Sequence, residues 1–163
     1  MVDPALRPAT ALDFAFCEEL SRSNMAAYRA ARGIAWDPQR FRASWAEFEN
    51  FVILAGDDAV GLLRLLPEGE ALGLRDLQVV PAHQRQGIGG WAVRQAQAIA
   101  LQRGHAGLKL RVYADNPARA LYARFGFGVV AEVDGTLHLA WSPPSAIGSA
   151  MPRGKVRERR GPP

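Results

Sequence analysis

The chain has 163 residues, of which 48% are hydrophobic and 22% charged, as expected for one soluble globular domain with a sizeable core. The net charge of +4 arises at the end of the chain, where five basic residues and one glutamate follow Met151. The rest of the chain is balanced, so a basic nucleic-acid-binding face on the domain is not expected. The single cysteine, Cys17, excludes a disulfide framework and a cysteine-based metal site.

Apolar periodicity and turn residues predict strands and helices that alternate along the chain. Strands are expected at 5–8, 51–55, 60–66, 74–80, 108–113, 127–133 and 136–141, and helices at 11–30, 39–49, 91–103 and 117–125. Thr10 is the expected cap of the first helix, with Asp13 at its third position. A polar run at 21–24 is a candidate break in that helix, and a turn region is expected over 67–73. The order of elements predicts an α/β (α+β layered) fold, in which a mixed sheet carries helices on both faces.

The ends of the chain bear on domain organisation and location. A single domain is expected over residues 1–141, whereas residues 142–163 have the Pro-, Gly- and Arg-rich composition of a disordered tail. The first residues lack the basic and apolar segments of a signal peptide. No apolar run approaches the roughly 20 residues that a membrane-spanning helix needs. We therefore expect a cytoplasmic protein that does not engage a membrane.

A glycine-rich turn, QRQGIGG at 84–90, separates the strand 74–80 from the following helix. Such a turn lets the backbone approach a ligand, and it points free N–H groups and the positive end of the helix dipole at one place. This is typical of phosphate-binding sites. The dinucleotide motif G-x-G-x-x-G does not fit, because its third glycine would fall on Ala92. Taken alone, the turn is equally compatible with a purely structural role.

A second segment, NPARALYARFGF at 116–127, follows one strand later. Its Leu121 and Phe125 form an apolar stripe that we interpret as core. Together with LQVVPAHQRQGIGG at 77–90, it resembles the two acetyl-CoA motifs of the GNAT superfamily of N-acetyltransferases. The resemblance covers about residues 5–141, and Arg85 stands where that superfamily often has a glycine. It implies a mostly antiparallel central sheet that is splayed at its middle strands, with acetyl-CoA as the cofactor.

The resemblance also implies roles for individual residues. The backbone amides of the glycine turn would hold the pyrophosphate, and the pantetheine arm would pair with the splayed strand. The implied cofactor-binding residues are Leu77, Gln78, Val79, Gln84, Arg85, Gln86, Gly87, Ile88, Gly89, Gly90 and Asn116. Tyr122 would act as the catalytic acid, because a phenol is a proton donor at neutral pH. A purely structural Tyr122 is the alternative.

The general base and the acceptor site are less well marked. Some relatives have Glu at the position aligned with Gly73, and others have His at the positions aligned with Gly73 and Arg75. This chain has neither Glu nor His there. Asp76 is the nearest carboxylate, although strand alternation places it opposite Arg75 and Leu77. Deprotonation of the amine through ordered water is the alternative.

The superfamily builds its acceptor pocket in the region that corresponds to residues 25–40. Tyr28 and Trp36 are therefore candidate substrate-binding residues, with a place in the core as the alternative. Arg75 is a candidate for bidentate binding of a substrate carboxylate, and a solvated or ion-paired arginine is the alternative.

These features predict an acetyl-CoA-dependent N-acetyltransferase that acts on a primary amine, either a small molecule or a peptide N-terminus. The expected mechanism is direct attack in a ternary complex. No metal, nucleic acid or membrane partner is expected, and a homodimer is possible. Because the usual base is missing, a non-catalytic acyl-CoA-binding module is the main alternative. A nucleic-acid-binding tail at 143–163 is a third possibility.

Overall fold

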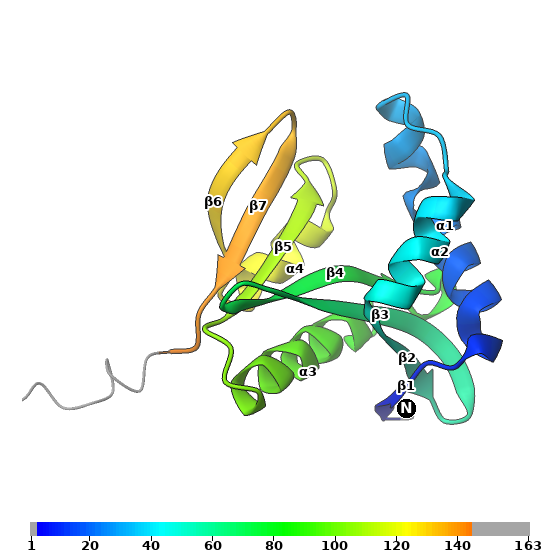
Figure 1. Cartoon of the computed structure of the whole chain (residues 1–163), viewed down its shortest axis with the longest axis horizontal. Coiled ribbons are helices and arrows are strands. Elements are labelled where there is room, and N and C mark those ends of the chain that lie inside the picture. Colours follow the sequence, from blue (N-terminus) through cyan, green and yellow to red (C-terminus); the bar gives the residue numbers. More distant parts are fainter. Residues whose placement is uncertain (1–2, 145–163) are drawn as a thin grey trace, which may run out of the picture.

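In the computed structural model, which describes residues 3–144, one seven-stranded sheet runs through the molecule (Figure 1). The strands are β1 (Pro4–Pro8), β2 (Glu49–Ala55), β3 (Asp58–Glu68), β4 (Ala71–Val79), β5 (Leu108–Tyr113), β6 (Gly128–Val133) and β7 (Thr136–Trp141). They lie in the order β1-β2-β3-β4-β5-β7-β6. All neighbours are antiparallel except β4 and β5, which are parallel.

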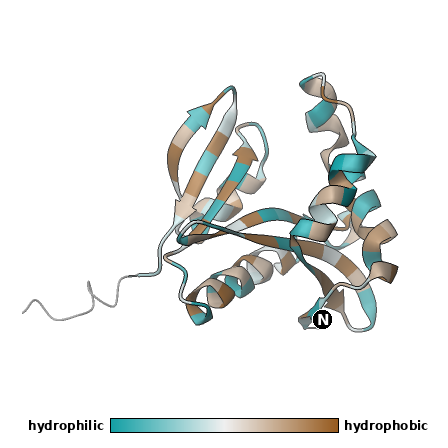
Figure 2. Cartoon of the chain, viewed as in Figure 1, coloured by the Kyte–Doolittle hydropathy of each residue, from teal (hydrophilic) through white to brown (hydrophobic). Residues whose placement is uncertain are grey.

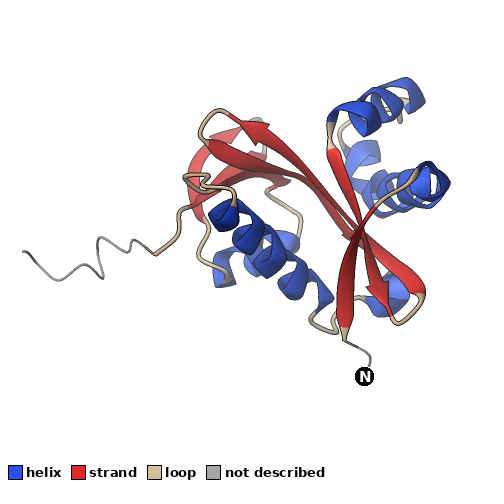
Figure 3. Cartoon of the chain, turned by 60° about the horizontal axis from the view of Figure 1, so that its bottom comes forward, coloured by secondary structure: helices blue, strands red, loops and turns tan. Residues whose placement is uncertain are grey.

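Helices cover both faces of the sheet (Figure 3). They are α1 (Phe14–Ala31), α2 (Pro38–Glu47), α3 (Ile88–Gln102) and α4 (Ala118–Arg124), with short 3-10 turns η1 (Ala11–Asp13) and η2 (Pro81–His83). The pair α1 and α2 packs on one face, and α3 and α4 pack on the other. None of the helices within residues 3–144 combines the length and apolar character needed to cross a membrane.

The parallel pair β4–β5 is short. Only Leu72 with Leu108 and Gly73 with Lys109 are paired. Beyond these residues the two strands diverge, and the sheet opens into two arms (Figure 1). One arm holds β1 to β4, and the other holds β5, β7 and β6. The predicted mixed and mostly antiparallel sheet, splayed at its middle strands, is confirmed.

The largest hydrophobic cluster lies between the sheet and α3 and extends along β5 and β7. Smaller clusters lie between α1, α2 and the β2–β3 hairpin, and around the first turn of α3. Figure 2 shows hydrophobic residues alternating with polar ones along β5 and β7. This alternation buries one face of these two strands against α3 and leaves their other face largely polar.

Three local predictions need correction. Helix α1 is continuous, because two residues of the polar run at 21–24, Ser21 and Asn24, face the sheet and hydrogen-bond to β4 with their side chains. The turn expected over 67–73 is a tight turn at Gly69, so β3 and β4 are longer than predicted. Helix α3 begins at Ile88, which places Gly89 inside the helix. Of the predicted tail, residues 145–163 lie outside the described residues.

The start of the first helix is fixed by the cap that the sequence predicted. Thr10 and Asp13 form a capping box, and Arg7 donates two hydrogen bonds of 2.8 and 2.9 Å to the Asp13 carboxylate. The Arg7 guanidinium lowers the pKa of Asp13 to about 2. The contact links β1 to the beginning of α1.

Replacing Asp13 with asparagine should therefore lower the free energy of unfolding at pH 7 by about 1–2 kcal/mol, discounted for the partial exposure of Arg7. Because the folded pKa is depressed, the wild-type contribution is present above about pH 4 and is lost as the pH falls toward 2. Denaturant unfolding at several pH values measures both effects. Glu19→Gln, which removes an exposed ion pair with Arg22, is the control and should cost less than about 0.5 kcal/mol. Equal losses in the two variants would contradict the assignment.

Candidate functional site

A cavity of about 1910 Å³ occupies the gap where β4 and β5 diverge. It is lined by α1 and α2 on one face of the sheet and by α3 and α4 on the other. Within residues 3–144, no group of three or more metal-binding side chains is placed to hold an ion. The cavity has two ends that differ in their lining. Backbone groups of the glycine turn line one end, and side chains line the other end, next to α1.

The glycine turn leads directly into the first turn of α3. Arg85 and Gly87 have positive φ values of 62° and 84°, which turn the chain from η2 into the helix. Among the described residues, none accepts a hydrogen bond from the backbone amides between Arg85 and Gly90. These amides and the positive end of the helix dipole suit a phosphate group. The amides of the turn are thus free to bind an anion, and the phosphate cradle itself stays a prediction.

Two glycines at the start of α3 also allow close helix packing. A Cβ atom on Gly89 would lie 3.2 Å from Leu121 Cδ2. On Gly90 it would lie 2.8 Å from Phe125 Cζ, nearer than real Cβ atoms approach. Leu121 and Phe125 therefore pack on these glycines and, partly buried, against the hydrophobic core. The absence of side chains at 89 and 90 thus lets Leu121 and Phe125 pack closely on α3.

The edge of β4 that faces the gap carries the other predicted cofactor residues. Leu77, Gln78 and Val79 all line the cavity. The Val79 carbonyl accepts hydrogen bonds from Asn24 Nδ2 (3.0 Å) and Gln84 Nε2 (2.9 Å). The side chain of Gln84 thus ties the glycine turn to β4.

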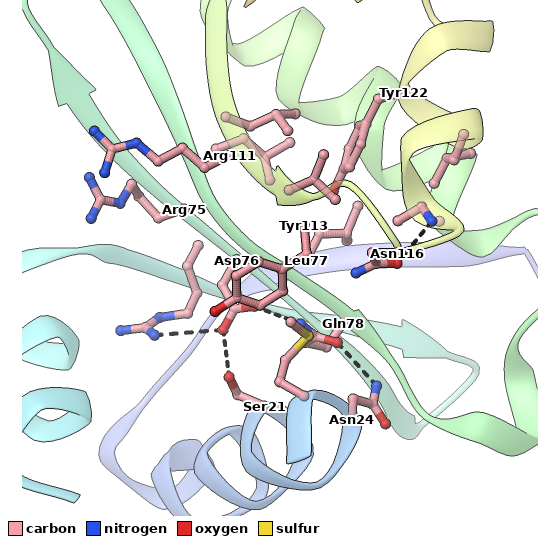
Figure 4. A pocket seen from close by; sticks show the side chains of 18 of the residues that line it. Ser21, Asn24, Arg75, Asp76, Leu77, Gln78, Arg111, Tyr113, Asn116 and Tyr122 are labelled. Atoms are coloured by element: carbon pink, nitrogen blue, oxygen red, sulfur yellow. Dashed lines mark hydrogen bonds and ion pairs between the residues drawn. The ribbon is translucent and has the colours of Figure 1, made fainter. Parts of the chain in front are cut away.

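Asp76 lies at the centre of a polar network beneath α1 (Figure 4). Its carboxylate accepts hydrogen bonds of 2.9 Å from Ser21 Oγ and from Gln78 Nε2. The guanidinium of Arg64, only 3% exposed, lies 3.8 Å away. Asn24 extends the network to Gln78 at 3.2 Å. Sequence reasoning missed Ser21, Asn24 and Arg64, because their contacts with β4 join residues distant in the sequence.

The position of Arg75 differs from the one expected by strand alternation. The register between β3 and β4 shifts between Arg64 and Leu65, so Arg75 faces the same side as Asp76. Its guanidinium forms an ion pair with Glu68 and lies 4.9 Å from the Phe48 ring, which also contacts Arg64. Arg75 lines the cavity but already has an ionic partner.

Tyr122 and Asn116 reach the cavity from α4 and the loop before it (Figure 4). Tyr122 is 6% exposed, and burial, with a smaller effect from the charge of Asp76, raises the pKa of its hydroxyl. Asn116 Oδ1 accepts a hydrogen bond of 2.9 Å from the amide of Ala118, in the first turn of α4. Asn116 therefore fixes the start of the helix that carries Tyr122.

Aromatic residues close the α1 side of the cavity. Tyr28 stacks on Tyr113 with ring centroids 6.1 Å apart, and Arg32 lies 3.7 Å above the same Tyr113 ring. Trp36 packs against Phe41 at 5.5 Å while it also lines the cavity. The structure thus brings both candidate substrate residues, Tyr28 and Trp36, to the end of the cavity that lies under α1.

Comparisons with known proteins agree with this geometry. Residues 15–127 match the sequence model of the acetyltransferase (GNAT) family. The chain belongs to this family. Acetyl-CoA is accordingly its cofactor, as the sequence predicted, and the free amides at the start of α3 suit the phosphates of that molecule. No curated protein matches the chain.

Solved structures of GNAT proteins share the fold. A PaiA N-acetyltransferase from Thermoplasma acidophilum, in complex with coenzyme A, is similar with a TM-score of 0.70 at 15% identity, covering 86% of this chain and 99% of that chain. The Escherichia coli ribosomal-protein-S18-alanine N-acetyltransferase gives 0.68 at 20% identity, with coverages of 86% and 94%. An acetyltransferase from Thermus thermophilus gives 0.67 at 25% identity, with coverages of 86% and 97%.

Gly87 offers a direct test of the phosphate cradle in this GNAT protein. Gly87→Ala should weaken coenzyme A binding at least about tenfold, because alanine disfavours the positive φ and would redirect the neighbouring amides. Gly104→Ala is the matched control, since Gly104 has a φ of +75° just beyond the other end of α3 and, like Gly87, open space at its Cβ. Calorimetric titration with coenzyme A and thermal unfolding separate binding from stability. A similar affinity in both variants would contradict the cradle.

Proposed function

We propose that the protein is an N-acetyltransferase that acetylates a primary amine of a small molecule or of a peptide N-terminus. The observation that carries the proposal is the pairing, in one cavity, of the free amides of the glycine turn with Asp76 and Tyr122. The similar proteins from T. acidophilum and E. coli are N-acetyltransferases, which supports an amine as acceptor. Bound acetyl-CoA supplies an acetyl thioester.

The two ends of the cavity have different tasks in this proposal. The amides from Arg85 to Gly90 bind the phosphates of the cofactor. The free edge of β4 at Leu77 and Val79 holds its arm along the gap between the strands. The region under α1 is left for the acceptor amine, with Tyr28 and Trp36 in its wall.

Direct attack by the amine, with both substrates bound, requires no enzyme nucleophile. Cys17, the one cysteine of the chain, is fully buried between α1 and the sheet. Burial raises the pKa of its thiol to about 12, so the reactive thiolate is scarce at neutral pH. These facts favour a ternary complex over a covalent acyl-cysteine route.

Tyr122 is the proposed acid of the reaction. Its raised pKa keeps the hydroxyl protonated throughout the physiological range. The edge-to-face contact with Phe127, at 5.6 Å between ring centroids, holds the ring in place. A rigid phenol at the inner end of the gap can therefore donate its proton to a leaving group.

Tyr122→Phe should lower kcat about 100-fold while leaving coenzyme A affinity within about twofold, because it removes the proton donor and keeps the ring. Acetyl-CoA and a broad panel of primary amines would be supplied, with coenzyme A release measured for both proteins. An unchanged kcat would remove Tyr122 as the acid. Cofactor binding without turnover on any amine of the panel would favour the non-catalytic acyl-CoA-binding module.

Asp76 is the proposed base, acting directly or through a water molecule. A primary amine with a pKa near 10 must lose a proton before it attacks. The carboxylate lines the cavity, and its charge is felt at Tyr122, so base and acid share one space. Ser21 and Gln78 hold the carboxylate in a fixed orientation.

Asp76→Asn should reduce kcat/KM by about 100-fold, because it removes the carboxylate that would accept the proton of the amine. Ser21→Ala is the control, because it removes one hydrogen bond but keeps the carboxylate, and its loss should stay within about tenfold. Thermal unfolding of both variants is measured alongside. If Asp76→Asn retains the wild-type kcat/KM, deprotonation through ordered water becomes the better account.

The proposal also covers the location and the partners of the protein. We propose a cytoplasmic enzyme without nucleic-acid or membrane partners, and a homodimer remains a prediction for solution measurements. The alternative of a nucleic-acid-binding tail falls almost entirely on residues outside the described part of the chain.

A further inference from the structure

The acceptor end of the cavity has an excess of basic side chains. Arg64 and Arg75, which line it, are compensated by Asp76 and Glu68. The remaining basic residues there are Arg29, Arg40, Lys109 and Arg111. None of these four makes an ion pair with a residue in 3–144, and the carboxylate of Asp37 caps α2. An uncompensated cluster of this kind attracts an anion.

Arg29 is the most constrained member of the cluster. Its guanidinium carbon lies 4.4 Å from the centroid of the Trp36 ring, a cation–π contact that holds the head group against the cavity wall. The Nη1 atom is buried and has no hydrogen-bond partner in the described residues. Arginine stays charged even when burial lowers its pKa, as it does here. A buried cationic donor without an acceptor is costly, so a ligand acceptor would satisfy it.

The opposite wall of this space is formed by β5. Leu110 and Val112 face the hydrophobic core with α3, so the alternating residues Lys109 and Arg111 face the acceptor side. Figure 4 shows the side chains of Arg111 and Arg75 extending in the same direction from the neighbouring strands β5 and β4. Because Glu68 compensates Arg75, Arg111 is the freer cation of the two.

This cluster is separate from the phosphate cradle. Arg29 belongs to α1, which packs on the face of the sheet opposite α3. Arg111 also faces away from α3, whereas the free amides lie at the start of that helix. The cofactor phosphates therefore do not account for the basic acceptor end.

We propose that the acceptor is a small amine that also carries an anionic group, a carboxylate or a phosphate, bound by Arg29 on one wall and Arg111 on the other. The inference rests on the proposed N-acetyltransfer and specifies its substrate class. A planar guanidinium suits both anions, because it presents two parallel N–H donors. The aromatic ring of Trp36 holds one such fork in place before the ligand arrives.

The test compares acceptors in matched pairs, amino acids against their carboxamides and aminoalkyl phosphates against the corresponding amino alcohols. The wild-type kcat/KM, measured by coenzyme A release, should favour the anionic member by roughly 10- to 100-fold, as expected for a charge-assisted hydrogen bond. The pair with the larger ratio identifies carboxylate or phosphate as the natural group. The same pairs are titrated calorimetrically with coenzyme A present, so that binding is measured independently of turnover.

Substitutions show which residues cause the preference for anionic acceptors. Arg29→Gln should reduce the ratio within each pair to nearly one, and Arg29→Lys should restore part of it by keeping the charge. Arg22→Gln is the control, because Arg22 lies on the same helix but pairs with Glu19 and does not line the cavity, and it should keep the wild-type ratio. If Arg29→Gln fails to fold, Arg111→Gln provides the same measurement from the other wall.

The outcomes separate this inference from the proposed function. Turnover of both members of every pair at equal rates would overturn the anionic acceptor while leaving N-acetyltransfer intact. If no amine is turned over, N-acetyltransfer fails, but calorimetric binding of the anionic members that is lost in Arg29→Gln would still support the anion site. If no member of any pair is turned over or bound, both the anion site and N-acetyltransfer are overturned.

Discussion

The short pairing of β4 with β5 is the constraint on which the rest of the site depends. Two residue pairs join these strands, and beyond Gly73 the edge of β4 that faces β5 has no ladder partner in the described part of the chain. Backbone groups on an open edge must find other acceptors and donors. The carbonyl of Val79 accepts hydrogen bonds from the side chains of Asn24 and Gln84. These bonds attach α1 and the glycine turn to the same point of the strand. The edge of β4 that is left free where the sheet opens therefore also positions both ends of the cavity.

Polar partners from β2, α2 and β4 compensate an otherwise expensive buried charge. Arg64 is almost fully buried between the Phe41 and Phe48 rings, where an unpaired guanidinium would be strongly destabilising. Its partners are Asn50, Ser44 and, more distantly, the carboxylate of Asp76. The network therefore fixes the Asp76 carboxylate against a rigid cation while leaving it in the cavity wall. Fixed orientation of a polar group is what a preorganised site requires.

The features that sequence reasoning predicted depend on local signals. The glycine turn, the capping box at Thr10 and the helical stripe of α4 each arise from residues near one another in the chain, and the structure contains all three. The features that sequence reasoning did not predict depend on contacts between distant segments of the chain. The polar run at 21–24 was compatible with a helix break, because its partners on β4 lie more than 50 residues away. The register shift that turns Arg75 toward Asp76 has no signature in β4 alone.

The two ends of the cavity also differ in how much they depend on side-chain identity. The proposed phosphate cradle consists of backbone amides, so most substitutions that preserve the turn and the close packing of α3 on α4 should leave it intact. The T. acidophilum and T. thermophilus structures share the fold at 15–25% identity. The acceptor end is built from side chains, among them Arg29, Trp36 and Arg111, and each can change without disturbing the cradle. In the proposed function, specificity for the amine would therefore depend on side chains under α1, because the fold alone does not determine it.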